Sequence, residues 1–413
     1  MAQIQFEMIA KLSLPKESDK FKPYEDVEYA SGWVNKTLKC NAVSGDNSFM
    51  LQVKGGCFKD GHNEVFVTGK PSVDADGKRQ KGENFRIAWK DRLTSPRLVE
   101  VAEFSKFIID LEEPNYRGSL QQLINKVKEG HEVTEEEVTK FGAKDLKGLE
   151  AALEKSNKKR KEFISEWDYA EFIYKMITSE KYKDRKFKIR GTYEMQYSES
   201  NGRWYNNYVP SRIYLSADDA EYMAEATVDF YFGADSLDNG SLLDKGKYYV
   251  NGYTFVYDSA RKENIPAPYT ISFPAAKDDS ELEAKREKVQ VKRFTVEDED
   301  SIYQYGIIVK LLNGAQREEL TEDMLTEEQL DSIMLGELTL EDIRRELGGS
   351  VYGERIVENV FSKPSRGFSK GREITSYTPD DLIIKPLETD TSAIEEVDSE
   401  DSLFDDDDDD LFN

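Results

Sequence analysis

Hydrophobic and polar residues alternate in short runs along residues 1–115, a pattern typical of half-buried strands. Strands are predicted over 4–14, 31–43, 48–58, 64–69 and 85–89, and turn signals such as SGDN and DADG separate them. The sequence RLVEVAEFSKFIIDL, at 97–111, predicts a helix. Residues 1–115 are therefore predicted to form a β-rich region.

The period of the pattern becomes helical over 116–180. Thr134 and Glu137 have the spacing of a capping box. Further on, apolar residues recur every three or four positions, at Phe163, Trp167, Ala170 and Tyr174. Such a stripe indicates a helix with one face in the core, and residues 116–180 are predicted to be a helical insertion.

A strand pattern returns over 181–310, which we predict to be a second β-rich region with many aromatic and basic residues. It contains a hairpin at 186–215, a short helix near 218–226 and further strands at 287–310. Two acidic amphipathic helices are predicted within 311–361, followed by a linker at 362–387 and an acidic tail at 388–413. The class is α+β, and the two β-rich regions could be one interrupted barrel or two.

The hairpin at 186–215 carries the main candidate binding face. A two-residue turn at Asn201 and Gly202 would place its lysines beside Val209 and Ile213, whereas a three-residue loop gives one consistent apolar face. We favour the longer loop. It puts bases and aromatic residues together on the outer face: Lys186, Lys188, Arg190, Trp204, Tyr208, Arg212 and Tyr214. Pro210 indicates a bulge or an edge position, and a bulge would reverse Arg212 and Tyr214.

The first predicted strand pair repeats this arrangement. The loop at 44–47 pairs even with odd positions, so that Leu38 and Leu51 face one core. Trp33, Lys39 and Lys54 then lie together on the outer face. Cations that follow phosphates, beside flat rings on which bases stack, are the groups that single-stranded nucleic acid requires.

The charge of the chain is unevenly distributed. The 413 residues include 57 Lys and Arg against 82 Asp and Glu, a formal net charge of −25. Residues 388–413 hold 13 acids and no base, which leaves −12 for residues 1–387. Between Lys155 and Arg190 the sign reverses, with 12 bases and six acids. This reversal leads directly into the hairpin.

The last residues combine charge with apolar groups. Six aspartates, Asp405, Asp406, Asp407, Asp408, Asp409 and Asp410, are followed by Leu411 and Phe412. The acidic run predicts a disordered tail, because like charges repel and little apolar surface can be buried. An exposed Leu-Phe pair is favourable only when it docks. A partner with a basic rim and an apolar pocket would fit, and the aspartates could also compete for the protein's own cationic groove.

The tail together with the two β-rich regions resembles the single-stranded-DNA-binding proteins of bacteria and their phages. That resemblance implies an OB-like antiparallel β-barrel core with helical insertions, and a tail that recruits replication or recombination proteins. The segment GWVNKTLKCNAVSGDNSFMLQV also resembles phage replication proteins. Two departures are that the bacterial tail ends in Pro-Phe rather than Leu-Phe-Asn, and that this chain is longer than one barrel.

Several function classes are disfavoured. The chain has no GxxxxGK[ST], GxGxxG or HExxH motif, so we expect no catalysis and no cofactor. Two cysteines and two histidines predict neither a disulfide framework nor a four-ligand zinc site. No signal peptide or membrane span is expected, which predicts a cytoplasmic protein. The leading hypothesis is a phage-encoded protein that coats single-stranded DNA; the alternative is an acidic or DNA-mimic protein that binds a basic partner.

Overall fold

The computed structural model describes residues 3–74, 77–276, 280–318, 325–339, 342–343, 351–366 and 370–384. Most described residues belong to β-strands, and helices are fewer, so the fold is α+β. Fifteen of the strands join one mixed sheet. The acidic tail predicted at 388–413 lies outside the described residues. No helix in the described ranges has the length and apolar character needed to cross a bilayer.

Five strands pair in a closed order that we call ring one: β1 (Ile4–Ser13), β3 (Trp33–Ser44), β4 (Asn47–Phe58), β11 (Lys186–Ser198) and β12 (Arg203–Leu215). Strand β1 pairs with both β3 and β11, while β3 pairs with β4 and β11 with β12, all antiparallel. A parallel contact between β4 and β12 completes the ring. Helix α4 (Glu166–Ile177) lies in sequence between β4 and β11 and packs against β3 and β4.

Five later strands repeat this order as ring two: β13 (Met223–Phe232), β15 (Lys247–Asp258), β16 (Glu263–Pro274), β17 (Ile302–Glu318) and β18 (Val351–Pro364). Strand β13 pairs with β15 and β17, and the contact between β16 and β18 is again parallel. Helix α6 (Glu281–Phe294) lies in sequence between β16 and β17. The chain therefore contains two successive rings of the same topology.

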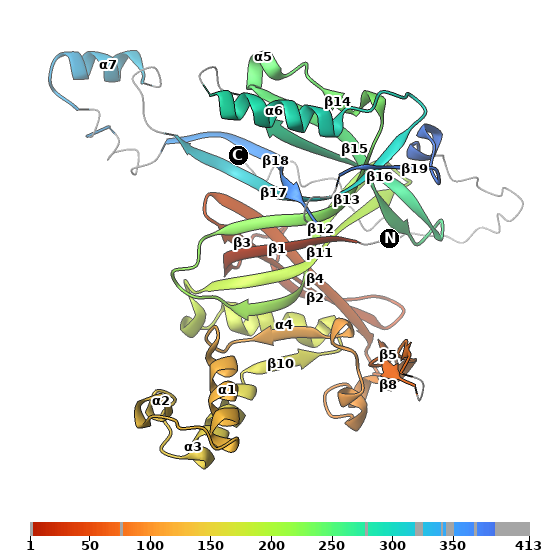
Figure 1. Cartoon of the computed structure of the whole chain (residues 1–413), viewed down its shortest axis with the longest axis vertical. Helices are drawn as coiled ribbons and strands as arrows, with labels where there is room; N and C mark the ends of the chain where they lie inside the picture. Colours follow the sequence, from red (N-terminus) through yellow and green to blue (C-terminus); the bar gives the residue numbers. More distant parts are fainter. Residues whose placement is uncertain are drawn as a thin grey trace, which may run out of the picture.

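The two rings are joined by strand pairing. Gln5 of β1 lies opposite Thr227 of β13, so that the first strands of the two rings are neighbours. The side chain of Asn47 accepts a hydrogen bond from the backbone N–H of Asn313 at 2.9 Å. Arg261 forms an ion pair with Glu199 at 2.5 Å, which joins the tip of the β11–β12 hairpin to ring two. Figure 1 shows the strands of ring two and α6 above those of ring one.

Aromatic side chains from α4 and α6 pack inside ring one and ring two. Phe294 of α6 is fully buried and contacts the rings of Phe230, Phe232 and Phe273. Tyr169 of α4 is buried beside Phe107. Full burial of one such side chain contributes about 1.5–3 kcal/mol, so each helix is held by its own apolar face.

Two insertions separate β4 from α4. A ribbon is formed by β5 (Glu64–Thr68) and β8 (Asn84–Ala88), and is extended by β6 (Ser72–Val73) and β7 (Arg79–Gln80). Helices α1 (Tyr116–Lys128), α2 (Glu135–Thr139) and α3 (Leu146–Asn157) form a module with its own small core. The capping box of Thr134 and Glu137 begins α2, as predicted. Figure 1 places the helical module farthest from ring two.

The remaining elements border the rings. They are β2 (Tyr24–Glu28), β9 (Phe107–Asp110), β10 (Arg160–Phe163), β14 (Leu237–Asp238), α5 (Leu242–Lys245), α7 (Glu327–Met334) and β19 (Arg372–Ile374). Strand β2 pairs with β3, whereas β9 pairs with β12 and β10.

Four predicted elements differ from the structure. Residues 97–111 form 3₁₀ turns and then β9, because Ile108 and Ile109 are β-branched and both completely buried. The helix predicted near 218–226 is absent, because β13 already begins at Met223, and in it the small buried residues Ala224 and Ala226 alternate with less buried ones. The first part of the predicted strand region 287–310 belongs to α6, which Ser280 caps. Within the described part of 311–361, β17 and β18 pair with each other and α7 is helical as predicted, while residues 344–350 of the second predicted helix lie outside the described residues.

Candidate nucleic-acid interface

The β3–β4 register agrees with the sequence prediction. Ser44 lies opposite Asn47, and Leu38, Cys40 and Leu51 are buried on the inner face. Trp33, Lys39 and Lys54 occupy the opposite parity and therefore share the outer face of ring one. The Lys39 ammonium lies 5.1 Å from the centre of the Phe21 ring. The predicted grouping of these three residues is thus present.

The β11–β12 register agrees with the prediction only in the half of the hairpin that lies away from its loop. There, Lys188 lies opposite Tyr214 and Arg190 opposite Arg212. At the tip, Ser198 pairs with Arg203 around a four-residue loop, instead of the predicted three-residue loop. The two halves are connected by a bulge at Ser211, next to Pro210, where Gly191 has no room for a Cβ against the Val209 carbonyl.

The bulge separates the predicted binding set. Arg212 and Tyr214 remain on the outer face with Lys186, Lys188 and Arg190, but Tyr208 faces inward. Its ring meets Phe6 and Phe49 edge to face at 5.4 and 5.5 Å, and burial raises the pKa of the Tyr208 hydroxyl. Tyr208 was therefore wrongly placed on the outer face, because the tip register and the bulge reverse its parity. Trp204 has the same parity as Tyr208, so its predicted place on the outer face beside the lysines was also wrong; it lies beside Tyr197, with ring centres 5.3 Å apart.

Carboxylates already bind several of the predicted bases. The Lys188 ammonium lies 2.7 Å from one oxygen of Glu7, and Arg190 binds the other oxygen. Burial raises the pKa of the Glu7 carboxyl, but these hydrogen bonds outweigh it and hold that pKa below its usual value. Lys186 donates to the Ala220 carbonyl at 2.7 Å, and Arg212 lies 3.8 Å from Glu103. A nucleic acid would compete with these contacts.

An aromatic groove opens where β4, β9 and α4 approach the ribbon. We define the groove by its six aromatic residues, Trp33, Phe66, Trp89, Phe104, Phe107 and Trp167. It has a volume of about 530 Å³ and is also lined by Lys106 and Glu166. Three of the four tryptophans of the chain therefore meet in one hollow.

The three tryptophan side chains of the groove are held in place by close packing and by nearby cations. The Trp33 indole lies over Gly56 of β4, where a Cβ would collide with it. Lys36 lies 4.4 Å from the centre of the Trp167 ring, and Arg92 lies 4.0 Å from that of Trp89. Arg92 is in turn held by Asp168 at 2.6 Å. These contacts keep the indoles in place without a ligand.

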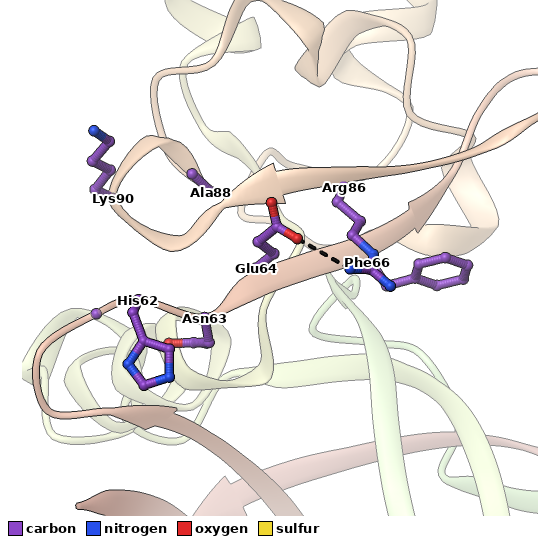
Figure 2. A pocket seen from close by; sticks show the side chains of 8 residues that line it. His62, Asn63, Glu64, Phe66, Arg86, Ala88 and Lys90 are labelled. Carbon is purple, nitrogen blue, oxygen red and sulfur yellow. Dashed lines mark hydrogen bonds and ion pairs between the residues drawn. The ribbon is translucent and has the colours of Figure 1, made fainter.

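Two of the six aromatic side chains of the groove are largely open to solvent. Phe66 is 64% exposed and Phe104 is 69% exposed. Phe66 also lines a neighbouring hollow of about 720 Å³ with His62, Arg86 and Lys90. Figure 2 shows Phe66 and Arg86 on neighbouring strands of the ribbon, with Glu64 3.3 Å from the Arg86 guanidinium. Phe104 lines a third hollow of about 320 Å³ with Arg79 and Lys81.

The three hollows form one track of aromatic and basic side chains, because consecutive hollows share a phenylalanine. We call this the aromatic track: the groove residues together with Arg79, Lys81, Arg86, Lys90 and Lys106. An exposed ring offers a stacking surface for any base, and a nearby cation can neutralise a phosphate. In the described part of the chain, no three His, Cys, Asp or Glu residues are grouped as metal ligands.

The sequence prediction missed most of the aromatic track. Trp167 was assigned to a core stripe; Ala170 is buried and Phe163 and Tyr174 pack on the core as predicted, but Trp167 turns toward the groove. Phe66 carries a signal, since it shares its parity with Glu64 and Thr68 and is thus a phenylalanine on a polar face. The predicted partner-binding residues Asp405–Asp410, Leu411 and Phe412 lie outside the described residues.

The comparisons with known proteins are sparse. No protein-family model matches the chain, and no curated protein matches it. Among solved structures, the chain is similar to a deletion variant of the single-stranded DNA-binding protein from Thermus aquaticus. The match covers 79% of this chain and 100% of that chain, with 9% identity and a TM-score of 0.27. A TM-score this low supports no conclusion about function. That conclusion must come from the site itself.

Proposed function

We propose that the protein binds single-stranded DNA without sequence preference and that bases stack in the aromatic groove of ring one. The observation that carries this proposal is the aromatic track, in which exposed Phe66 and Phe104 continue a groove of three tryptophans beside five bases. Stacking on aromatic rings tolerates any base, because every base has a π-face.

The topology supports the same proposal. We infer that each ring is an OB-like barrel, because the first strand pairs with the second and fourth and the third lies parallel to the fifth. Barrels of this kind bind oligonucleotides on their second and third strands. In ring one these strands are β3 and β4, which carry Trp33, Lys39 and Lys54.

The wider role that we propose is non-catalytic. The protein would coat single strands during replication, recombination or repair, in the cytoplasm of a phage-infected host. Residues 405–412 would recruit a partner protein through their aspartates and the Leu-Phe pair. This part of the proposal rests on the sequence alone.

The proposal is tested by titrating labelled oligo-dT and matched duplex with the full-length chain while following anisotropy and tryptophan emission. We expect preferential binding to oligo-dT with quenching of the groove tryptophans. Replacing both Phe66 and Phe104 with alanine should weaken binding at least about fivefold, since one base stack contributes about 1–3 kcal/mol. Tyr257→Ala is a matched control, because Tyr257 is 63% exposed but lies on ring two. Equal effects of the two changes would contradict the proposal.

The alternative is an acidic or DNA-mimic protein that binds a basic partner. It is favoured by the negative charge of residues 1–387 and by the carboxylates that already bind Lys188 and Arg190. A truncation to residues 1–387 distinguishes the two functions. Tighter oligo-dT binding after truncation supports DNA binding with a competing tail, whereas no binding by either chain supports the alternative.

A further inference from the structure

The outer face of ring two differs from that of ring one. On β15, Tyr253 and Phe255 lie opposite Pro268 and Pro266, and Tyr231 of β13 lies opposite Tyr253. These aromatic residues have the parity that points away from the core of ring two, since Gly252 and Thr254 take the inner parity. By topology this is the face that carries Trp33 in ring one. Yet Phe255 and Tyr231 are only 5% and 3% exposed.

A later segment of the chain covers this face. We call residues 372–382 the strap. It begins with β19, where Ile374 pairs with Ile302 of β17, and ends in a 3₁₀ turn at Pro379–Leu382. Tyr377 stacks on Phe255 with ring centres 4.4 Å apart and an interplanar angle of 22°. Leu382 is buried in the same small cluster.

The strap is held by few contacts. Its ladder with β17 contains three residue pairs, and Ser301 donates a hydrogen bond to Glu373 at 3.0 Å. Arg372 donates a hydrogen bond to Gln304 of β17 at 3.0 Å, and Thr378 donates two hydrogen bonds to Asp381 within the strap. Its apolar cluster is separate from the main core of the rings. Detachment of the strap would therefore leave the core of ring two intact.

The stacked tyrosine occupies the place that a base would take. Two flat rings at this distance and angle have the geometry by which a nucleic-acid base stacks on an aromatic side chain. The strap also brings Asp380 and Asp381 three and four residues after Tyr377. It thus offers a flat ring and negative charge, the two groups that a nucleotide would offer.

We propose that ring two holds a second site for single-stranded nucleic acid, formed by Tyr231, Tyr253 and Phe255, and that the strap closes it. This inference rests on the proposed function. In the closed state only ring one binds DNA. When the strap detaches, bases replace Tyr377 on Phe255, and one molecule covers a longer stretch of strand.

The test compares the full-length wild type with Tyr377→Ala and with the control Tyr377→Phe, which keeps the stacked ring. Binding is measured for a short oligo-dT that fits ring one and for one several times longer. Tyr377→Ala should tighten binding to the long oligonucleotide about fivefold or more and enlarge the occluded length, with the short one unchanged. A fivefold change corresponds to about 1 kcal/mol. Tyr377→Phe should behave as the wild type.

Further variants keep the test decisive. Adding Tyr253→Ala to Tyr377→Ala should remove the gain, because it deletes part of the opened site. Leu382→Ala loosens the strap at its other end, and should reproduce the gain if Tyr377→Ala does not fold. Thermal melting and hydrogen exchange of β19 report folding and detachment. Wild-type binding without any gain in a folded, strap-released variant overturns this inference alone; absence of wild-type binding overturns the proposed function.

Discussion

Glu7→Gln tests whether the outer face of β11 contacts DNA. Glu7 binds both Lys188, at 2.7 Å, and Arg190. Glutamine keeps the shape of the side chain but releases the two bases from their carboxylate. The change should cost about 0.4–2 kcal/mol of unfolding free energy, because it removes two pairs whose basic partners are 36% and 47% exposed, and such pairs contribute about 0.2–1 kcal/mol each.

The effect on DNA binding follows from the same contacts. The net charge of the Glu7, Lys188 and Arg190 cluster rises by one, and up to two basic side chains become available to contact phosphates. For single strands the slope of log K against log salt changes by about 0.7 for each phosphate contact, so we expect a slope steeper by about 0.7 to 1.4. Oligo-dT titrations at four or more salt concentrations measure this slope.

Glu225→Gln is the matched control for Glu7→Gln. Glu225 lies directly opposite Glu7 on β13, so its replacement makes the same charge change one strand away. If the two variants give the same slope while DNA still binds, Lys188 and Arg190 do not contact the strand. The interface would then be confined to the aromatic track.

Three further predictions concern stability. Burial raises the pKa of Glu112, but hydrogen bonds from Lys159 and from the Glu113 backbone N–H outweigh burial and lower that pKa. The stability that Glu112 contributes is therefore present above about pH 4.3 and is lost as the pH falls further, which denaturant melts at pH 3 to 7 would show. Burial and the nearby Glu194 raise the pKa of Glu166, so Glu166→Gln should raise the melting temperature at pH 7 but not at a pH where Glu166 is already protonated. Phe294→Ala should cost about 3–5 kcal/mol in urea unfolding, because the side chain is fully buried, and a loss under 1 kcal/mol would contradict the packing of α6.

Local patterns in the sequence predicted the strands of ring one well. The parity of Leu38, Cys40 and Leu51 fixes the inner face of β3 and β4, and the short turn at Gly45 and Asp46 sets their register. The structure shows the same register. The β11–β12 hairpin was harder: Pro210 indicated a bulge, and the structure has one at Ser211, but the four-residue tip loop means that Tyr208 and Trp204 change parity instead of Arg212 and Tyr214.

The aromatic track could not be predicted from local patterns. Trp33 and Trp167 are far apart in the sequence, and only the packing of α4 against β4 brings them together. Within α4 the helical period places Trp167 in the same stripe as Ala170, yet the stripe extends past the edge of the core. Similarly, no pattern indicates that Tyr377 stacks on Phe255, because tertiary contacts alone determine where the strap lies.

Ion pairs of the Lys and Arg side chains also change the salt dependence of DNA binding that the charge pattern predicts. Many of the 12 bases between Lys155 and Arg190 bind acids from other segments, as Lys159 binds Glu112 and Arg185 binds Glu113. If all 12 neutralised phosphates, the salt slope for single strands would be about −8. The five basic residues of the aromatic track give about −3.5 at most, because Arg86 binds Glu64 and Lys106 binds Glu162. We therefore expect a slope no steeper than about −3.5, with stacking supplying the remaining affinity, and a slope near −8 would refute the aromatic track as the main interface.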